Sequence, residues 1–401
     1  MATSTHKALV IVAPRQPYEI HQYPTTVPQA DEVLVKVLFT SSTPLDLHQA
    51  DGGLLIEPPF RPGSSCAGFV VEVGPEVKHL QPGDKVFGFG RQDAKEKPHQ
   101  EFVTGPAWTF GKIPEGFSME EAVTLPTNFV TVFNTMWADL DLPTPWPKPE
   151  GYTPPRAHDN ILIWGASSSV GQYAIQILKF YGYRNLIVTA SSANHQRLRE
   201  LGASEVYDYR SPTIVDDLLE PRQKYSASPA FPLIIDCIGS VPGSLRHISK
   251  VAQSGSTVAV MLPVILTHAT REEAPEYGMD VSTSVEWAEG VTPRGVRTHF
   301  FWRNEFFVEK LQSVIMPEML ARGIVKPNKY KLVEGRDLLE RATKALDLLR
   351  DGNAYGFDKE GLLHLIDKAG DLVDYFHKDF PVYSLQSRNF VITPPNPGCK
   401  N

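Results

Sequence analysis

The clearest pattern of apolar and polar residues lies between residues 161 and 190. An apolar run from Ile161 to Trp164 has the length of a buried parallel strand. After a turn of small residues, apolar positions recur at helical spacing until Gly182, a typical helix C-cap. A second apolar run, Leu186 to Val188, predicts the next strand. The stretch therefore predicts a strand–helix–strand unit, whose helix N-terminus offers free N–H groups and a positive dipole end to a pyrophosphate.

The turn keeps only part of the glycine pattern that is typical of dinucleotide-binding folds. Where that pattern has three glycines, this chain has Ala166, Ser168 and Gly171. An ordinary α/β crossover with small residues for close packing is therefore the alternative. The strand at 186–188 is followed by Thr-Ala-Ser-Ser, so it lacks the acidic residue that binds the ribose 2′-hydroxyl of NAD. Ser192 and His195 can instead donate hydrogen bonds to a 2′-phosphate. If a dinucleotide binds, NADPH is favoured over NADH.

Short strands separated by glycine and proline turns precede this unit, and they predict a small β-rich domain over roughly the first 115 residues. The strands are predicted at 7–12, 32–39, 69–73 and 85–88. The capping box Ser118-Met119-Glu120-Glu121 predicts a helix start, and a second helical stretch follows around Thr131 to Ala138. Prolines crowd residues 142–155, so we expect an extended surface excursion there.

Strands alternate with helices after the central unit. Further strands are predicted at 206–209, 233–239 and 257–262, with helices at 195–201, 305–322 (interrupted at Pro317) and 337–350. This alternation predicts an α/β fold with a doubly wound parallel sheet, whose ligand lies beyond the carboxyl ends of the strands.

Composition narrows the functional classes. The chain has 401 residues, 42% of them hydrophobic and 21% charged, as in an ordinary globular protein of two domains. A net charge of −7 without any basic run argues against a nucleic-acid partner. The three cysteines, Cys66, Cys237 and Cys399, form no CxxC pair and are typical of a reducing compartment. No apolar run reaches about 18 residues and no signal pattern opens the chain, so we expect a cytoplasmic protein without membrane contact.

An ordered set of motifs carries a family resemblance over about residues 7–350. The motifs are Pro44-x-Asp46, Gly63…Ala67-Gly68, Val73-Gly74-x-x-Val77, Pro82-Gly83-Asp84-x-Val86, Gly165…Gly171, Leu201-Gly202-Ala203 and Asp236-Cys237-Ile238-Gly239. With them the chain resembles the medium-chain dehydrogenase/reductase family. The resemblance implies a GroES-like substrate domain, residues 1–134 completed by 311–401, and a Rossmann NADPH domain, residues 135–310.

Within the family, the chain looks like the zinc-free branch of quinone reductases and fungal stand-alone enoyl reductases of polyketide biosynthesis. Zinc-dependent members carry a cysteine where this chain has Thr43, and a histidine and a glutamate where it has Ser64 and Ser65. The four-cysteine lobe that they carry after Asp84 has no counterpart in residues 86–102. Hydroxyl groups do not make a zinc site of the usual N/S ligands, so we expect no metal.

The resemblance also implies roles for named residues. Ser167 to Val170 would face the pyrophosphate, Ser192, His195 and Tyr209 the 2′-phosphate and adenosine, and Thr131 and Pro44 the nicotinamide. The full set of predicted cofactor-binding residues is Pro44, Thr131, Ala166, Ser167, Ser168, Ser169, Val170, Ser192, His195, Tyr209, Ile238, Gly239, Met261 and Leu262. No catalytic residue is assigned, and solvent or the cofactor ribose could supply the proton; Thr131 is named only for its place near the nicotinamide.

Each singled-out residue has a plainer interpretation. Tyr209 can be an ordinary strand-edge tyrosine, and His195 a polar residue of a first helical turn. Thr131 can bond its own helical turn, as threonines often do. Asp46 is better interpreted as a helix cap than as an acid. Cys66 is better interpreted as a buried small residue than as a nucleophile, since no histidine or aspartate partner pattern accompanies it.

The resemblance implies an NADPH-dependent reductase that transfers a hydride to an activated carbon–carbon double bond, and a polyketide-type enoyl thioester is the favoured substrate. The substrate would be a small molecule or carrier-bound, with a polyketide synthase as a candidate partner, and the oligomeric state stays open. Two alternatives stay open: a quinone or small-enone reductase, and an NADPH-binding sensor without turnover.

The end of the chain departs from the family. Relatives usually finish with a short strand soon after the helix at 337–350. Here the apolar residues Leu362, Leu363, Leu365, Ile366, Ala369, Leu372, Val373 and Phe376 have the spacing of an amphipathic helix. We therefore expect an atypical helical extension within residues 353–401.

Overall fold

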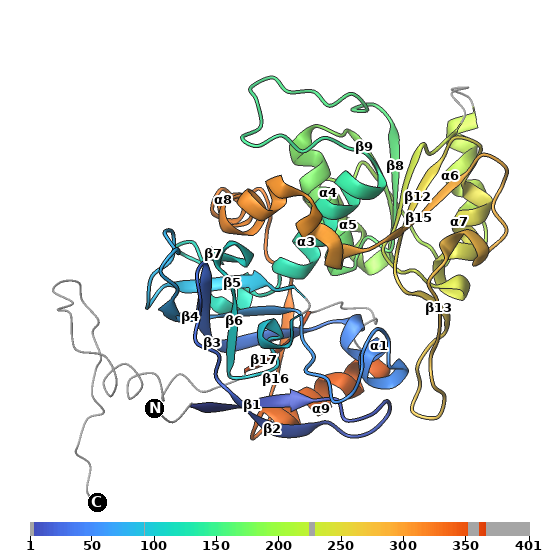
Figure 1. The fold of residues 1–401 in the computed structure, drawn as a ribbon. Coiled ribbons are helices and arrows are strands. Elements are labelled where there is room, and N and C mark those ends of the chain that lie inside the picture. Colours follow the sequence, from blue (N-terminus) through green and yellow to red (C-terminus); the bar gives the residue numbers. More distant parts are fainter. Residues whose placement is uncertain (1–3, 92, 224–228, 352–360, 366–401) are drawn as a thin grey trace, which may run out of the picture. The chain divides into compact units, whose positions relative to one another are not determined.

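The computed structural model describes residues 4–91, 93–223, 229–351 and 361–365. Its β-rich part begins with an antiparallel pair, β1 (Thr5–Val10) and β2 (Glu19–Pro24). A second sheet has the strand order β16-β17-β3-β4-β5-β7, with β6 also paired to β3. Its strands are β3 (Glu32–Ser42), β4 (Ser65–Val73), β5 (Lys85–Phe89), β6 (Phe102–Pro106), β7 (Phe110–Lys112), β16 (Tyr330–Val333) and β17 (Gly361–Leu365). Helices α1 (Pro44–Gly52) and α9 (Leu338–Arg350) belong to this part (Figure 1).

The valines of β3 share one face of this sheet. Val33, Val35 and Val37 point from β3 into one buried cluster with Leu47 of α1 and Leu346 of α9. An antiparallel strand presents alternate side chains to one face, so three valines two residues apart pack together against the helices.

The second part is a parallel six-stranded sheet in the order β10-β9-β8-β11-β12-β15. The strands are β8 (Asn160–Trp164), β9 (Asn185–Thr189), β10 (Glu205–Tyr207), β11 (Leu233–Asp236), β12 (Thr257–Met261) and β15 (Thr292–Val296). Helices α4 (Ser169–Tyr181), α5 (His195–Leu201), α6 (Ile214–Gln223) and α7 (Arg246–Val251) connect them (Figure 1). This sheet confirms the predicted doubly wound α/β fold.

Shorter elements join the two parts. Helices α2 (Met119–Ala122) and α3 (Pro126–Asn134) precede the parallel sheet, and α8 (Met316–Ala321) follows it. A hairpin of β13 (Val264–Thr267) and β14 (Glu276–Gly278) follows β12. No helix in the described residues combines the length and the apolar character that crossing a bilayer requires.

Two sequence predictions are corrected. Residues 361–365 form strand β17 and not the start of a helix, because they pair with both β3 and β16. These two ladders provide hydrogen-bond partners for the backbone N–H and C=O groups of the strand. This stabilisation outweighs the apolar spacing, which would also suit a helix. The remainder of the predicted helix, from Ile366 to Phe376, lies outside the described residues. Strand β10 ends at Tyr207, two residues earlier than predicted, because the Asp208 carboxylate accepts a hydrogen bond from the Arg210 N–H and starts a turn.

The predicted limits of the two domains, 1–134 with 311–401 and 135–310, stay predictions. The β-rich sheet does contain β16 and β17, which follow the parallel sheet in sequence.

Candidate functional site

The turn between β8 and α4 is fixed to the end of the neighbouring strand β9. The Gly165 N–H donates to Oγ1 of Thr189 at 3.1 Å, and the Ala166 N–H donates to the Thr189 carbonyl at 2.9 Å. Ser168 is the N-cap of α4, and its Oγ accepts from the Gly171 N–H at 3.2 Å. A helix of 13 residues therefore begins at the carboxyl edge of the sheet, where its first N–H groups can meet an anion.

The other predicted residues of this turn lie around that helix start. Ala166, Ser167 and Val170 are buried, whereas Ser168 and Ser169 are half-buried. The Ser167 carbonyl accepts a hydrogen bond from Nε2 of Gln172 at 2.9 Å, which holds the turn against α4.

Two glycines let the strand ends approach one another closely. Gly165 has φ 75°, and a Cβ on it would lie 2.5 Å from Cδ1 of Ile238. Gly239 has φ 63°, and a Cβ on it would collide with the carbonyl oxygen of Met261. Both positions therefore require glycine, for conformation and for space. The structure thus brings the β8 turn together with Ile238, Gly239 and Met261, and Leu262 follows directly.

Asp236 shapes the end of β11. Its buried carboxylate accepts from Oγ of Ser244 at 2.7 Å and from the Ile238 N–H at 2.9 Å. Burial raises the pKa of Asp236 to about 6, since the charged form loses its hydration. The carboxylate thereby fixes the backbone that carries two of the predicted cofactor residues.

Polar residues gather at the ends of β9 and β10. Nε2 of His195 lies 3.1 Å from the Ala190 carbonyl oxygen, so this ring nitrogen is engaged by the backbone. Ser192 is exposed, and its Oγ accepts from the Arg210 guanidinium at 3.3 Å. The same guanidinium donates twice to Asp208, at 2.9 and 2.6 Å, and holds the pKa of that carboxyl well below its usual range.

Tyr209 lies beside this group with 40% of its surface exposed. The guanidinium carbon of Arg210 is 6.0 Å from the centre of the Tyr209 ring. The proposed contacts of Ser192, His195 and Tyr209 with adenosine and a 2′-phosphate stay predictions.

Thr131 and Pro44 lie on helices outside the parallel sheet. Oγ1 of Thr131 donates to the Thr127 carbonyl at 2.7 Å, the plain helical role that the sequence allows. It also accepts from Oγ1 of Thr298 at 3.0 Å, in the 3₁₀ turn Thr298–Arg303 that follows β15. Pro44 is exposed at the first position of α1. Thr131 is thereby tied to the carboxyl end of β15.

The positions at which zinc-dependent members of the resembled family carry ligands have local partners here. The Thr43 N–H donates to Oδ2 of Asp46 at 2.7 Å, so Asp46 caps α1 as predicted. Oγ of Ser65 lies 2.6 Å from Oγ1 of Thr127. Across the described residues no group of three or more His, Cys, Asp or Glu side chains could hold a metal ion. That this protein works without zinc stays a prediction.

Cys66 behaves as a buried small residue. It is 4% exposed, and burial raises the pKa of its thiol to about 12. The thiolate that a nucleophile requires is therefore scarce at neutral pH.

Sequence reasoning missed a polar cluster around the β13–β14 hairpin. Nδ1 of His48, on α1, lies 2.9 Å from the Tyr277 hydroxyl of β14. Burial lowers the pKa of His48 to about 4, so this histidine is neutral at pH 7. Nε2 of His268 lies 3.0 Å from Oγ of Ser240, which follows Gly239. The two short strands of the hairpin gave no clear pattern in sequence, so nothing there indicated these contacts.

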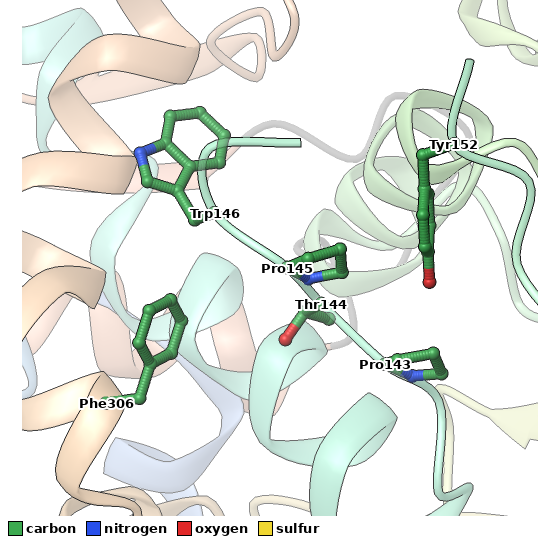
Figure 2. Close-up of a pocket in the computed structure, with 6 residues that line it drawn as sticks. All are labelled: Pro143, Thr144, Pro145, Trp146, Tyr152 and Phe306. Atoms are coloured by element: carbon green, nitrogen blue, oxygen red, sulfur yellow. The ribbon is translucent and has the colours of Figure 1, made fainter. Parts of the chain in front are cut away.

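The proline-rich segment 142–155 forms an apolar pocket of about 360 Å³. It is lined by Pro143, Thr144, Pro145, Trp146, Tyr152 and Phe306, with Tyr152 and Phe306 on opposite sides of the segment (Figure 2). None of the predicted cofactor residues lines it. The carboxyl edge of the parallel sheet, and not this pocket, is therefore the candidate site.

Comparisons with known proteins found similar chains. Residues 29–134 match the family model described as the alcohol dehydrogenase GroES-like domain. The chain is 30% identical to the trans-enoyl reductase himH of Aspergillus japonicus over 331 residues, which cover 80% of this chain and 86% of the relative. It is also 30% identical to the trans-enoyl reductase buaC of Petromyces alliaceus over 281 residues, covering 68% and 74% of the two chains.

A solved structure, the CurK enoyl reductase, has a similar fold. It superposes with a TM-score of 0.66 at 16% identity and covers 90% of this chain and 99% of its own. At this identity the likeness concerns the fold alone.

Proposed function

Because the chain belongs to the medium-chain dehydrogenase/reductase family, we propose that it is an NADPH-dependent enoyl reductase without zinc. The substrate is a conjugated enoyl thioester of the polyketide type. The observation that carries the proposal is the match to trans-enoyl reductases along most of both chains.

The residues at the carboxyl edge of the sheet fit a nicotinamide dinucleotide. The N-terminus of α4 suits the pyrophosphate, and the turn before it consists of small residues. Gly165 and Gly239 leave no Cβ where the strand ends meet, which lets Ile238 and Met261 pack closely around the turn before α4. The bound nicotinamide would supply a hydride. The contribution of the chain is to orient the reactants and to exclude water.

Two features support NADPH over NADH. No acidic residue follows β9 to hold a ribose 2′-hydroxyl, and the exposed Ser192 hydroxyl stands beside the Arg210 guanidinium. An arginine suits a phosphate because its planar fork donates two parallel hydrogen bonds.

The enoyl thioester is proposed as carrier-bound, with a polyketide synthase as the partner that presents it. This rests on the resemblance to fungal stand-alone enoyl reductases of polyketide biosynthesis, because the relatives' names themselves say only trans-enoyl reductase. A quinone or small enone would instead be a free acceptor, and an NADPH sensor would have no acceptor.

The test measures NADPH oxidation with an enoyl pantetheine thioester and, separately, with a quinone, each repeated with NADH. We expect turnover of the thioester with NADPH and little with NADH. Turnover of the quinone only would make the protein a quinone reductase. The protein could instead bind NADPH without turning over the thioester, the quinone or a carrier-bound enoyl group. That result would make it an NADPH-binding sensor.

A matched pair of variants tests the location of the site. Gly165→Ala places a Cβ against Ile238, whereas Gly83→Ala has a similar φ of 91° with nothing within 4 Å. We expect Gly165→Ala to weaken NADPH binding at least tenfold, about 1.4 kcal/mol, and Gly83→Ala to retain it. Equal effects of the two variants would mean that backbone strain alone, and not the site, is responsible.

A further inference from the structure

Two threonine hydroxyls meet at the carboxyl edge of the parallel sheet. Oγ1 of Thr298 lies 3.0 Å from Oγ1 of Thr131, which in turn lies 2.7 Å from the Thr127 carbonyl oxygen. Thr298 follows the last residue of β15 by two positions, and Thr131 lies in the middle of α3. Thr131 is 8% exposed and Thr298 is half-buried, so water competes little for the Thr131 hydroxyl.

The Thr127 carbonyl fixes the direction of both hydroxyl protons. A carbonyl oxygen only accepts, so the Thr131 hydroxyl gives its single proton to Thr127. Thr131 then has no proton for Thr298, and the Thr298 hydroxyl donates to it. Each hydroxyl carries one proton and two acceptor lone pairs. Both protons are therefore used within the pair and its carbonyl, and the pair offers only lone pairs to a ligand.

The residue that supplies this carbonyl is itself held in place. The Thr127 N–H donates to Oγ of Ser65, in β4, at 3.0 Å, and the side-chain oxygens of the two residues lie 2.6 Å apart. Ser65 thereby caps a free N–H in the first turn of α3 from another element. The orientation of the Thr131 hydroxyl is consequently set by the fold before any ligand binds.

The strand order places the two threonines at one end of the candidate site. The predicted adenosine contacts follow β9 and β10, and the predicted pyrophosphate contact follows β8. On the other side of β8 lie β11, β12 and β15, in that order. A dinucleotide that crosses this edge in one direction therefore carries its nicotinamide toward β12 and β15. Val296, at the end of β15, pairs with Met261 of β12, so Thr298 stands close to one of the predicted cofactor residues.

We propose that Thr131 and Thr298 recognise the carboxamide of the nicotinamide by accepting hydrogen bonds from its NH₂ group, an inference that rests on the proposed cofactor. The NH₂ group of a carboxamide donates, and its carbonyl oxygen only accepts. Lone pairs on the two threonines are satisfied by the first group and left unpaired by the second. The pair therefore determines which way the carboxamide points.

The same polarity keeps the substrate carbonyl away from the pair. Hydride transfer to a conjugated thioester places negative charge on the thioester oxygen, which requires a hydrogen-bond donor. Because both threonine protons are committed, neither hydroxyl supplies that donor. Thr131 and Thr298 are thus specificity-determining residues for the cofactor and take no part in proton transfer.

Cofactor analogues test this polarity in the wild type. The 3-acetylpyridine analogue of NADP⁺ replaces the NH₂ group by a methyl group and keeps the carbonyl, whereas the thionicotinamide analogue keeps the NH₂ group. Isothermal titration is expected to give the acetylpyridine analogue a dissociation constant about tenfold or more above that of NADP⁺. The thionicotinamide analogue is expected to bind within about threefold of NADP⁺. Equal affinity for NADP⁺ and the acetylpyridine analogue would overturn the proposal.

Variants assign the discrimination to the two threonines. Thr131→Val deprives the Thr298 proton of its acceptor, so that proton can turn to a ligand carbonyl, and the preference for NADP⁺ over the acetylpyridine analogue is expected to fall to about twofold or less. Thr131→Ser keeps the hydroxyl and is expected to retain the preference. Thr298→Val removes one acceptor and is expected to give an intermediate preference. Thr135→Val is the matched control, because the Thr135 hydroxyl donates to the Thr131 carbonyl in the same way, four residues further along.

The outcomes separate this inference from its premise. A preference that stays unchanged in Thr131→Val and Thr298→Val, with NADP⁺ still bound, would overturn the role of the threonines alone. A preference that the variants remove, without turnover of any enoyl thioester, would support this inference and refute the enoyl reductase. Absence of NADP⁺ binding by the wild type would overturn both. Thr298→Val changes a half-buried position in a 3₁₀ turn, and it reports the contact even if Thr131→Val does not fold.

Discussion

Arg210 divides its hydrogen bonds between a negative and a neutral neighbour. Its guanidinium makes two donations to Asp208 and a longer one, at 3.3 Å, to the Ser192 hydroxyl. A 2′-phosphate would offer oxygens that compete with the Asp208 carboxylate for the same fork. The preference for NADPH is therefore expected to depend on this arginine, and the aspartate is expected to moderate it.

The substitution Arg210→Gln tests this expectation. Loss of the charge is expected to raise the dissociation constant of NADPH about tenfold, about 1.4 kcal/mol, and to leave that of NADH within about twofold. Isothermal titration with the two nucleotides measures both. Arg184→Gln, an exposed arginine at the amino end of β9, is the matched control. An equal loss of affinity for both nucleotides in Arg210→Gln would show a structural role.

At the scale of elements, the segment after α3 contains an unusual carboxylate. A π-helical turn, Thr135–Asp139, continues α3, and Oδ2 of Asp139 is buried without a hydrogen-bond partner in the described residues. Burial raises the pKa of Asp139 to about 7, although Arg294 and Arg297 act in the opposite direction. An ionised Asp139 is therefore costly for the folded protein.

This cost has a defined pH dependence. The folded-state pKa is raised above the ordinary value of 3.8, so the folded protein binds the proton more tightly than the unfolded chain does. The free energy of unfolding consequently falls between about pH 4 and 7 and is constant above. Because Asp139 is partly exposed, we expect a loss of about 1–2 kcal/mol rather than the ~4 kcal/mol of a fully desolvated shift.

Asp139→Asn should remove the dependence. Thermal unfolding of the variant and the wild type is expected to differ little at pH 4.5 and to favour the variant at pH 8. Asp159→Asn is the control, because Asp159 pairs with Arg156 on the surface. A wild-type stability that runs parallel to that of Asp139→Asn across this range would refute the assignment.

The strength of local signals decides which elements the sequence predicts. The unit β8–α4–β9 was predicted closely because its apolar runs are regular and both helix ends carry caps, Ser168 and Gly182. The hairpin β13–β14 was missed, since strands of four and three residues depend on tertiary contacts. The contact of Thr298 with Thr131 could not be predicted either, because it joins segments far apart in the chain.

At the scale of the whole described chain, the β13–β14 hairpin connects the carboxyl edge of the parallel sheet, the candidate site, to the β-rich part. At its base the Ile265 N–H donates to the Gly239 carbonyl at 2.7 Å. At its tip the Arg15 guanidinium donates to the carbonyls of Glu273, Thr270 and Arg271. The hairpin also carries Tyr277, which bonds His48 of α1. Both ends of this connection are thus anchored, one on each part, by hydrogen bonds.

Arg15→Ala removes the Arg15 hydrogen bonds at the tip and leaves the base, the Tyr277–His48 contact and the Arg271–Asp351 pair in place. Loss of each hydrogen bond from the charged guanidinium lowers the free energy of opening the hairpin by about 1–3 kcal/mol. The hairpin should therefore open more often while the sheet stays folded. Hydrogen exchange is expected to accelerate about tenfold or more in residues 264–278 and to stay unchanged in β8. NADPH affinity should fall a few-fold, because Gly239 and Met261 lie at the base of the same hairpin.

Arg322→Ala, which breaks only a surface pair with Glu318 in one helix, controls for the loss of an arginine. Uniform acceleration across both sheets would instead mean that Arg15 supports global stability, and an unchanged hairpin would mean that its other contacts hold it in place.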